Sequence, residues 1–263
     1  MKKIIELLMV LLLIAGCGAG NKESSADELY DLALEAWDNK DYEKSFEYMS
    51  QSAEAGSIAA YYDLGSMYYY GNGVDKDETK ALENYLIAAD NGVGSACELV
   101  GWFYEQGIGT TISDEKAFEY YQKGAELHHP GSTMRVGWFY EHAIVVDEDL
   151  EKAFDYYLKA AELGDIWSQR KIGYCYADGV GVEADYEKAY QWFNTAAKNG
   201  DGWSYYNLAI MYNEGLFVEL SAEKTKEYLE KAIAVNDSEI IEVIKEDIAD
   251  GYFEGDAIPD SLK

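Results

Sequence analysis

Apolar residues recur along this chain at the spacing of one helix face. Between Ala96 and Tyr104 they fall at i, i+3, i+4, i+7 and i+8, which places them along one side of a helix. Gly107 and Gly109 then interrupt the helical pattern, and a second run of the same period begins a few residues later. The pattern therefore predicts short amphipathic helices in pairs, with glycines between them.

Three positions of the pattern keep one residue type at intervals of 36 residues. They hold the lysines Lys44, Lys80, Lys116, Lys152, Lys188 and Lys224, the tyrosines Tyr68, Tyr104, Tyr140, Tyr176 and Tyr212, and the glycines Gly65, Gly101, Gly137 and Gly173. A fixed period of this length is typical of a solenoid, in which each unit buries its apolar face only against its neighbours. We therefore expect function on an extended surface rather than in a single cleft.

The repeated glycines fall in the middle of predicted helices, where glycine costs up to about 1 kcal/mol relative to alanine. Because this cost recurs at one position of successive units, the sequence predicts that another helix approaches closely there. We expect the small pairs near the end of the second helix, such as Ala88-Ala89 and Ala160-Ala161, to form the opposite wall.

One full unit runs from Leu64-Gly65 through Gly71-Asn72-Gly73-Val74 and Lys80-Ala81 to Ala88-Ala89 and Gly92. This pattern resembles the Sel-one-like repeat, a relative of the tetratricopeptide repeat, and four further units carry it in phase. The resemblance implies an all-α fold, a right-handed α-solenoid of about six and a half helix pairs.

The same pattern divides the chain into segments. We interpret residues 1–16 as a signal peptide and 17–26 as a tether, and residues 27–56 look like a tetratricopeptide unit with a shorter turn. Five Sel-one-like units follow at 57–92, 93–128, 129–164, 165–200 and 201–236, and a capping helix with a tail fills 237–263. In the third unit Ala143 and Val145 replace the loop glycines, and the fifth unit is divergent.

The first residues have the features of an export signal. Lys2 and Lys3 precede an apolar run, Leu7 to Ile14, that is too short to span a bilayer. The stretch Leu13-Ile14-Ala15-Gly16-Cys17 resembles a bacterial lipobox, which makes Cys17 the expected lipidation site. An ordinary signal peptide with an incidental cysteine is the alternative. The predicted location is the cell envelope, on the outer membrane where the organism has one, with the lipid on Cys17 as the anchor.

Charge narrows the range of partners. The formal net charge is −29 at pH 7, the reverse of the basic footprint that nucleic-acid binding needs. Such acidity keeps an exported protein soluble and favours partners with basic residues. It would also repel an anionic membrane surface, so we expect membrane contact only through the lipid.

Catalytic and metal-binding patterns are weak. His128, His129 and His142 are the only histidines, and no further ligand stands at zinc spacing from them, so we predict no metal site. The sequence contains no nucleophile elbow, phosphate loop or zinc-protease motif, so we expect neither a cofactor nor enzyme activity. Cys97 and Cys175 belong to units too far apart for a disulfide.

The resemblance also implies which side chains face a partner, because the first helix of each pair lines the concave surface in tetratricopeptide-type stacks. Carried over position by position, the groove residues are Tyr62, Ser66, Tyr69, Tyr70, Glu98, Trp102, Glu105, Gln106, Met134, Trp138, Glu141, His142, Trp167, Arg170, Tyr174, Asp178, Trp203, Tyr206, Asn213 and Glu214. Four of the six tryptophans fall in this set, and aromatic residues carry much of the energy of interfaces. The hypothesis is an aromatic channel with acidic flanks that accepts an extended or helical segment. The alternative is that the rings only pack against the adjacent helix.

The predicted function is a membrane-anchored, non-catalytic scaffold or adaptor that binds a partner protein or peptide in this groove. A cell-envelope sensor that binds a peptidoglycan fragment is the second hypothesis. A weak hydrolase comes third, because the cysteine-rich relatives linked to β-lactam hydrolysis carry paired cysteines in each repeat and this chain does not. The oligomeric state stays open.

Overall fold

The computed structural model describes residues 25–262, and all regular structure in this range is helical. The helices are α2 (Ala26–Asp38), α3 (Tyr42–Glu54), α4 (Ile58–Tyr70), α5 (Glu78–Asp90), α6 (Gly94–Gln106), α7 (Asp114–Glu126), α8 (Pro130–Glu141), α9 (Leu150–Glu162), α10 (Ile166–Asp178), α11 (Tyr186–Lys198), α12 (Gly202–Glu214), α13 (Ala222–Ala234) and α14 (Ser238–Ala249), followed by the 3₁₀ turns η1 (Gly255–Ala257) and η2 (Asp260–Leu262). The predicted signal peptide and the predicted lipidation site, Cys17, lie outside the described residues.

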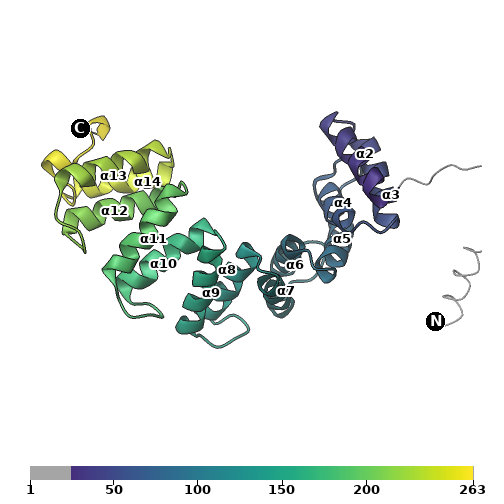
Figure 1. Cartoon of the computed structure of the whole chain (residues 1–263), viewed down its shortest axis with the longest axis horizontal. Helices are drawn as coiled ribbons and strands as arrows, with labels where there is room; N and C mark the ends of the chain where they lie inside the picture. The colour runs from purple at the N-terminus through teal and green to yellow at the C-terminus, as the bar shows by residue number, and fades with distance from the viewer. Residues whose placement is uncertain (1–24, 263) are drawn as a thin grey trace, which may run out of the picture.

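Consecutive helices pack as hairpins, and the hairpins stack. Contacts are densest within the pairs α2–α3, α4–α5, α6–α7, α8–α9, α10–α11 and α12–α13, and next densest between the second helix of one pair and the first helix of the following pair. Figure 1 shows the pairs following one another along an open arc, from purple α2 and α3 to yellow-green α14. Six pairs and one final helix confirm the predicted all-α solenoid.

Each second helix of a Sel-one-like unit begins at a side-chain cap. Asp77, Ser113, Asp149, Asp185 and Ser221 each accept a hydrogen bond from the backbone N–H three residues on. That N–H belongs in every case to a lysine of the repeated series, so the lysines mark the third residue of each second helix. The caps satisfy N–H groups that have no partner inside the helix, and they set where the helix starts.

The third unit keeps the loop conformation of the others although both of its loop glycines are replaced. In four units the first helix ends at a glycine with φ between 68° and 75°. Ala143 and Val145 adopt φ of 54° and 53° in the third unit. This left-handed region is costly for a β-branched residue such as Val145. At Gly109, the residue of the second unit that matches Val145, the loop lies so close to the preceding unit that a Cβ would be 2.3 Å from the Glu78 carbonyl oxygen.

The repeated mid-helix glycines lie against aromatic rings. A Cβ on Gly101 would lie 2.6 Å from Cε1 of Tyr121, a residue of the second helix of the same unit. The matching ring in the other units belongs to Tyr85, Tyr157 or Phe193. The predicted close approach is therefore present, but the predicted opposite wall of alanines was wrong. A flat ring fits the space left by the absent Cβ, whereas the pair Ala88-Ala89 is buried elsewhere in the core.

The lysine series and the tyrosine series meet in space. The Lys80 ammonium on α5 lies 5.3 Å from the centroid of the Tyr68 ring on α4. The same contact recurs at 4.8, 5.3 and 5.0 Å in the pairs Lys116–Tyr104, Lys152–Tyr140 and Lys188–Tyr176. Exposed cation–π contacts contribute about 0.5–1 kcal/mol each. The two series thus form one recurring contact that joins the two helices of a unit.

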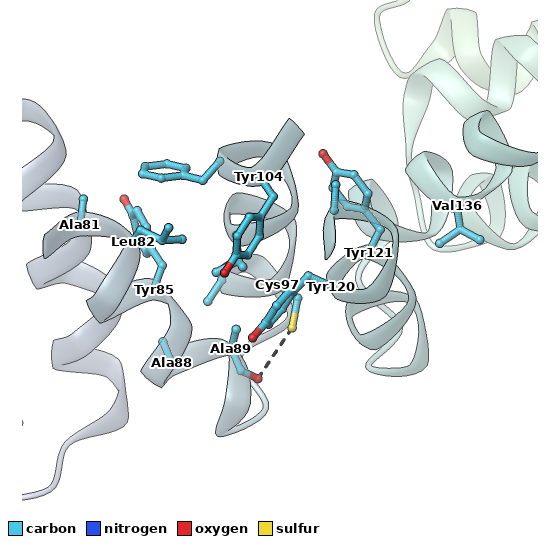
Figure 2. Close-up of a cluster of buried hydrophobic side chains, with 14 of the residues drawn as sticks. Ala81, Leu82, Tyr85, Ala88, Ala89, Cys97, Tyr104, Tyr120, Tyr121 and Val136 are labelled. Atoms are coloured by element: carbon cyan, nitrogen blue, oxygen red, sulfur yellow. Dashed lines mark hydrogen bonds between the residues drawn. The ribbon is translucent and has the colours of Figure 1, made fainter. Parts of the chain in front are cut away.

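Buried side chains form separate clusters along the arc, as a solenoid requires. Figure 2 shows the cluster that extends from α5 to α8, in which the Cys97 thiol is directed at the Ala89 carbonyl oxygen at 3.7 Å. In the same cluster the rings of Tyr104 and Tyr120 stack with centroids 6.0 Å apart. Cys175 is buried in the next cluster, which extends from α9 to α12.

The last helix closes the C-terminal end of the core. Ile240 and Ile244 on α14 are buried together with Leu229 on α13 and with Phe253, which follows α14. None of the helices in residues 25–262 has the length and apolar character that a membrane crossing requires.

Candidate functional site

The predicted groove positions all belong to the first helices of the pairs. Figure 1 shows α6 and α8 on the inner side of the arc, with α7 and α9 outside them. The candidates lie on α4, α6, α8, α10 and α12, or, for His142, at the residue that caps α8. None of the twenty is buried: fourteen are half-buried, and six are exposed, namely Tyr70, Gln106, His142, Trp167, Asp178 and Glu214.

Aromatic rings form a continuous run from α4 to α6. The Tyr69 ring meets the Trp102 ring edge-on, with centroids 6.0 Å apart. The Tyr70 ring packs against Tyr69 at 4.9 Å and is 70% exposed. These rings contact one another and still offer surface to a partner, so packing and binding are compatible at these positions.

Towards the N-terminal end, an apolar pocket of 260 Å³ lies between α2 and α4, with Leu34, Trp37 and Ser66 in its wall. The Ser66 hydroxyl lies 2.9 Å from the hydroxyl of Tyr85 on α5. The Tyr62 ring packs against the same tyrosine, with centroids 5.7 Å apart. Ser66 and Tyr62 therefore hold the first and second helix of their unit together while they face the inner side.

Between α6 and α8 the inner face opens into a second pocket, of 460 Å³. Pockets of about 300–1,000 Å³ are typical of ligand sites. The wall combines four predicted residues, Glu98, Trp102, Glu105 and Gln106, with three that the sequence analysis did not include, Leu99, Tyr121 and Arg135.

Two glutamates on this face, Glu105 and Glu141, are paired with cations from the following unit. Arg135 Nη2 contacts both carboxylate oxygens of Glu105, and the Tyr121 hydroxyl donates a hydrogen bond to Glu105 Oε2 over 2.8 Å. The side chains of Arg135 and Glu105 are 20% and 18% exposed, so the pair is largely withdrawn from water.

Glu141 repeats this arrangement one unit later. Lys171 Nζ donates to one of its carboxylate oxygens over 2.6 Å, and the Tyr157 hydroxyl donates to the other over 2.6 Å. Burial opposes ionisation of Glu141, but these two hydrogen bonds outweigh it and hold the pKa of Glu141 below its usual range. Burial and the acceptor Glu141 raise the pKa of Tyr157 well above that of a free tyrosine. The acidic flanks that the sequence predicts are thus internally neutralised at Glu105 and Glu141.

The tyrosine and the cation of each cluster were not predicted from the sequence, because only residues at the same position of successive repeats were compared with one another. In both clusters the tyrosine follows the glutamate by 16 residues and the cation follows it by 30. The register of Arg135 and Lys171 holds Leu99 and Asn207 in the flanking units, so it shows no repeated residue type. A search for charge pairs that recur at one separation would have found both clusters.

Trp138 is held by charged and aromatic groups of its own chain. The guanidinium carbon of Arg135 lies 4.4 Å from the Trp138 ring centroid. The His142 imidazole stacks on the Trp138 ring with centroids 4.4 Å apart, and its Nδ1 lies 2.9 Å from the Trp138 carbonyl oxygen. Much of the Trp138 ring is therefore already engaged.

Groove residues on α8 and α10 also contact neighbouring elements. Arg170 Nη1 donates to Asp201 Oδ1 over 2.9 Å, and Asp201 in turn caps α12. The Trp167 ring meets Tyr157 edge-on with centroids 5.4 Å apart. Met134 packs against the core cluster of α9 to α12. These contacts orient the side chains without burying them.

A third pocket on this face, of 310 Å³, lies between α10 and α12 and includes Tyr174, Asp178 and Glu214 in its wall. Asn207 Nδ2 donates a hydrogen bond to the Tyr174 hydroxyl over 2.7 Å. The Tyr252 hydroxyl, from the segment after α14, donates to Glu214. The tail of the chain therefore contributes to this end of the face.

The C-terminal segment contacts groove positions of the last unit that the sequence analysis assigned to a partner. The Tyr206 hydroxyl donates to Asp247 on α14, and Asn213 Nδ2 donates to the Tyr252 carbonyl oxygen over 3.0 Å. Trp203 packs against the core cluster that α14 completes. The C-terminal segment thus supplies hydrogen-bond partners for Tyr206 and Asn213, because α14 lies where the first helix of another repeat would follow.

The described part of the chain contains no group of three or more His, Cys, Asp or Glu residues that could hold a metal ion. His129 has a local role instead, because the Ser132 backbone N–H donates to His129 Nδ1 at the start of α8 over 3.4 Å. His128 is exposed in the preceding turn, with φ of 57°.

The repeated hairpins and their inner face define a family. The profile of the Sel1 repeat matches residues 38–57, 58–93, 94–129, 130–165, 168–201 and 204–237. The chain therefore belongs to the Sel1 repeat family, whose members generally mediate protein–protein interactions. The first match includes α3, which the sequence analysis placed in a tetratricopeptide-like unit.

Two solved structures show the same architecture. A protective antigen of uropathogenic Escherichia coli with an SLR fold superimposes with a TM-score of 0.79 and 26% identity, over 87% of this chain and 50% of that one. This chain therefore spans about half the length of that relative. A Sel1 repeat protein from Oxalobacter formigenes gives a TM-score of 0.77 and 25% identity, over 88% of this chain and 94% of that one. The sequence matched none of the curated proteins with which it was compared.

Proposed function

We propose that this protein is a non-catalytic scaffold that holds a polypeptide segment of a partner protein along the inner face of the arc. The observation that carries the proposal is the row of half-buried rings on consecutive first helices, Tyr69, Trp102 and Trp138, beside the open pocket between α6 and α8. Aromatic side chains of this kind dominate the energy of protein interfaces. The general role of the Sel1 repeat family supports the same reading.

Crosslinking from the inner face tests this proposal. A photoreactive residue replaces Gln106, which is exposed on α6, or Gln191, which is exposed on α11, a second helix. In cells we expect a specific protein adduct from position 106 and none from position 191. Adding Trp102→Ala should reduce the adduct at least several-fold while the helical circular dichroism signal stays unchanged.

Two outcomes would reject the proposal. Equal adducts from both positions would show that the inner face is not a preferred surface, and an adduct insensitive to Trp102→Ala would remove the aromatic row from recognition. Co-sedimentation with purified peptidoglycan, lost in Trp102→Ala, would replace the polypeptide with a cell-wall fragment.

We further propose that the scaffold is tethered to the cell envelope by acyl chains on Cys17. Stable anchoring needs about two acyl chains, which lipoprotein maturation supplies on one cysteine. A clickable fatty acid fed to cells should label the chain, and Cys17→Ser should abolish the label and release the protein from membranes. The control variant Cys97→Ala should keep both the fatty-acid label and the attachment to membranes. A label that persists in Cys17→Ser would refute Cys17 as the lipidation site.

A further inference from the structure

Trp102 and Trp138 occupy the same position in neighbouring repeats, and a cation of the chain lies over only one of the two rings. Arg135 precedes Trp138 by three residues and lies over its ring at 4.4 Å. In the preceding unit the matching position is Leu99, and no cation of residues 25–262 lies over the Trp102 ring. The Trp102 indole is half-buried, and its electron-rich ring, which attracts a positive charge, has no such cation over it.

A carboxylate lies in the same pocket wall as this ring. Glu98 precedes Trp102 by one helical turn on α6, whereas the residue at that position before Trp138 is Met134. The Glu98 side chain is 39% exposed. Within the described residues its one ion-pair partner is His129, whose Nδ1 lies 3.8 Å from Glu98 Oε2 and is charged only when protonated.

Gly131 on α8 gives this carboxylate its place. A Cβ on Gly131 would lie 2.2 Å from Glu98 Oε1, so the absence of a side chain lets the carboxylate lie against the first turn of α8. The first turn of a helix favours a negative charge beside it. Glu98 is thereby held in the pocket wall next to Trp102.

Among the charged residues that line the pocket between α6 and α8, one carboxylate does not belong to the Arg135–Glu105 ion pair. Its charged wall residues are Glu98, Glu105 and Arg135. Arg135 and Glu105 neutralise each other through their ion pair. Glu98 therefore contributes a carboxylate that pairs with no lysine or arginine of the described residues, beside the Trp102 indole ring, in a space of 460 Å³.

We propose that this pocket takes a lysine or arginine side chain of the bound partner segment, with the cation over Trp102 and hydrogen-bonded to Glu98. The inference rests on the proposed function, because it names the chemistry of one anchor in that segment. The contact of Arg135 with Trp138 is its counterpart within the chain. The net charge of −29 attracts a basic segment and repels an acidic one during approach.

Fluorine NMR on the full chain in detergent micelles tests the pocket. The protein is labelled with fluorotryptophan, the Trp102 signal is assigned from Trp102→Phe, and the probe is the capped peptide acetyl-Gly-Arg-Gly-amide. Titration should shift the Trp102 signal, whereas the citrulline peptide, which keeps the shape without the charge, should shift it little. Glu98→Gln should weaken arginine-peptide binding about five-fold. Glu83→Gln, at an exposed carboxylate on α5, should leave binding unchanged.

The outcomes separate this inference from the proposed function. Equal binding of the arginine and citrulline peptides, or unchanged affinity in Glu98→Gln, would overturn the cation pocket. If the crosslinker at position 106 still captures a partner in a Trp102-dependent way, only the pocket inference falls. If the arginine peptide binds as expected but the crosslinker gives no adduct specific to the inner face, the pocket stands and the proposed scaffold function falls.

Discussion

At the scale of single residues, two carboxylates on the inner face, Glu105 and Glu141, are each satisfied by a tyrosine of their own unit and a cation of the next unit. Glu105, Tyr121 and Arg135 come from α6, α7 and α8, so one cluster joins three helices. Removing one partner from a half-buried charged pair leaves the other group short of hydrogen bonds in a poorly solvated place. These clusters therefore stabilise the contact between units, and their carboxylates are not free for a partner.

Arg135→Ala should lower the free energy of unfolding by about 1–3 kcal/mol, because Glu105 keeps only Tyr121 and Trp138 loses its cation. Urea denaturation measures this change. Lys224→Ala removes an exposed ion pair with Glu227 and should cost less than about 1 kcal/mol. Equal losses in the two variants would contradict the importance assigned to the buried pair.

Glu141 should make stability depend on pH in acid. Its pKa is lower in the folded chain than its ordinary value of 4.5, so its pairing stabilises the fold above that pH and is lost as the pH falls through the folded-state pKa. Glu141→Gln should be less stable than the parent at neutral pH, and the difference should shrink below about pH 4.5. Thermal unfolding of both proteins across this pH range measures the difference. A stability difference that does not change with pH would show that the ionisation of Glu141 is not linked to folding.

At the scale of helices, packing overrides intrinsic propensity. Alanine is the better helix former by about 1 kcal/mol, yet glycine recurs at mid-helix because a ring from the second helix occupies the space of its Cβ. Val145 also keeps a left-handed conformation that its β-branched side chain disfavours. Capping residues determine where the helices start, whereas packing against neighbouring helices determines where a residue of low helix propensity, such as a mid-helix glycine, is found.

Gly101→Ala should destabilise the protein by about 1–3 kcal/mol, because the new methyl group would lie 2.6 Å from the Tyr121 ring. Chemical denaturation of the single variant shows whether the free energy of unfolding falls or rises. In a Tyr121→Leu background the penalty should shrink, which a double-mutant cycle measures. A gain in stability from Gly101→Ala would show that propensity, and not the ring contact, governs this position.

Val145→Gly should raise the free energy of unfolding by about 1 kcal/mol, because glycine relieves the strain at a φ of 53°. Val146→Gly serves as the matched control, since the structure does not place that residue at positive φ, and it should give no gain. If the two variants behave alike in denaturation, strain at Val145 is not the cause.

At the scale of the whole molecule, stability is shared between neighbours. The core consists of successive clusters, and α14 closes the last one with Ile240 and Ile244. In such an array a change at one end propagates only through nearest-neighbour contacts. The groove is therefore a surface shared by several units, and no single unit would present it alone.

Removing residues 238–263 should loosen the array from its C-terminal end, because it uncovers Leu229 and Ala232 on α13. Hydrogen exchange should quicken in α12 and α13 and stay unchanged in α4 and α5. The same acceleration in every helix would show that the chain unfolds as one cooperative unit instead.

Which helices face inward was implied by the family resemblance, whereas the sequence alone was enough to predict the helical pairs and their number. These features follow from a period of 36 residues, from capping positions and from amphipathic spacing, all of which are local. Even the exceptions at Ala143 and Val145 were visible as breaks in the period.

Only the tertiary structure decided which groups satisfy one another across units. The pairing of Glu105 with Arg135, the cation over Trp138 and the contact of the tail with Asn213 all join residues from different units or elements. Such contacts depend on the rotation and offset between stacked hairpins, which the packed side chains set together. A repeat period measures distance along the chain and contains no information about that rotation, so the different surroundings of Trp102 and Trp138 became visible only in three dimensions.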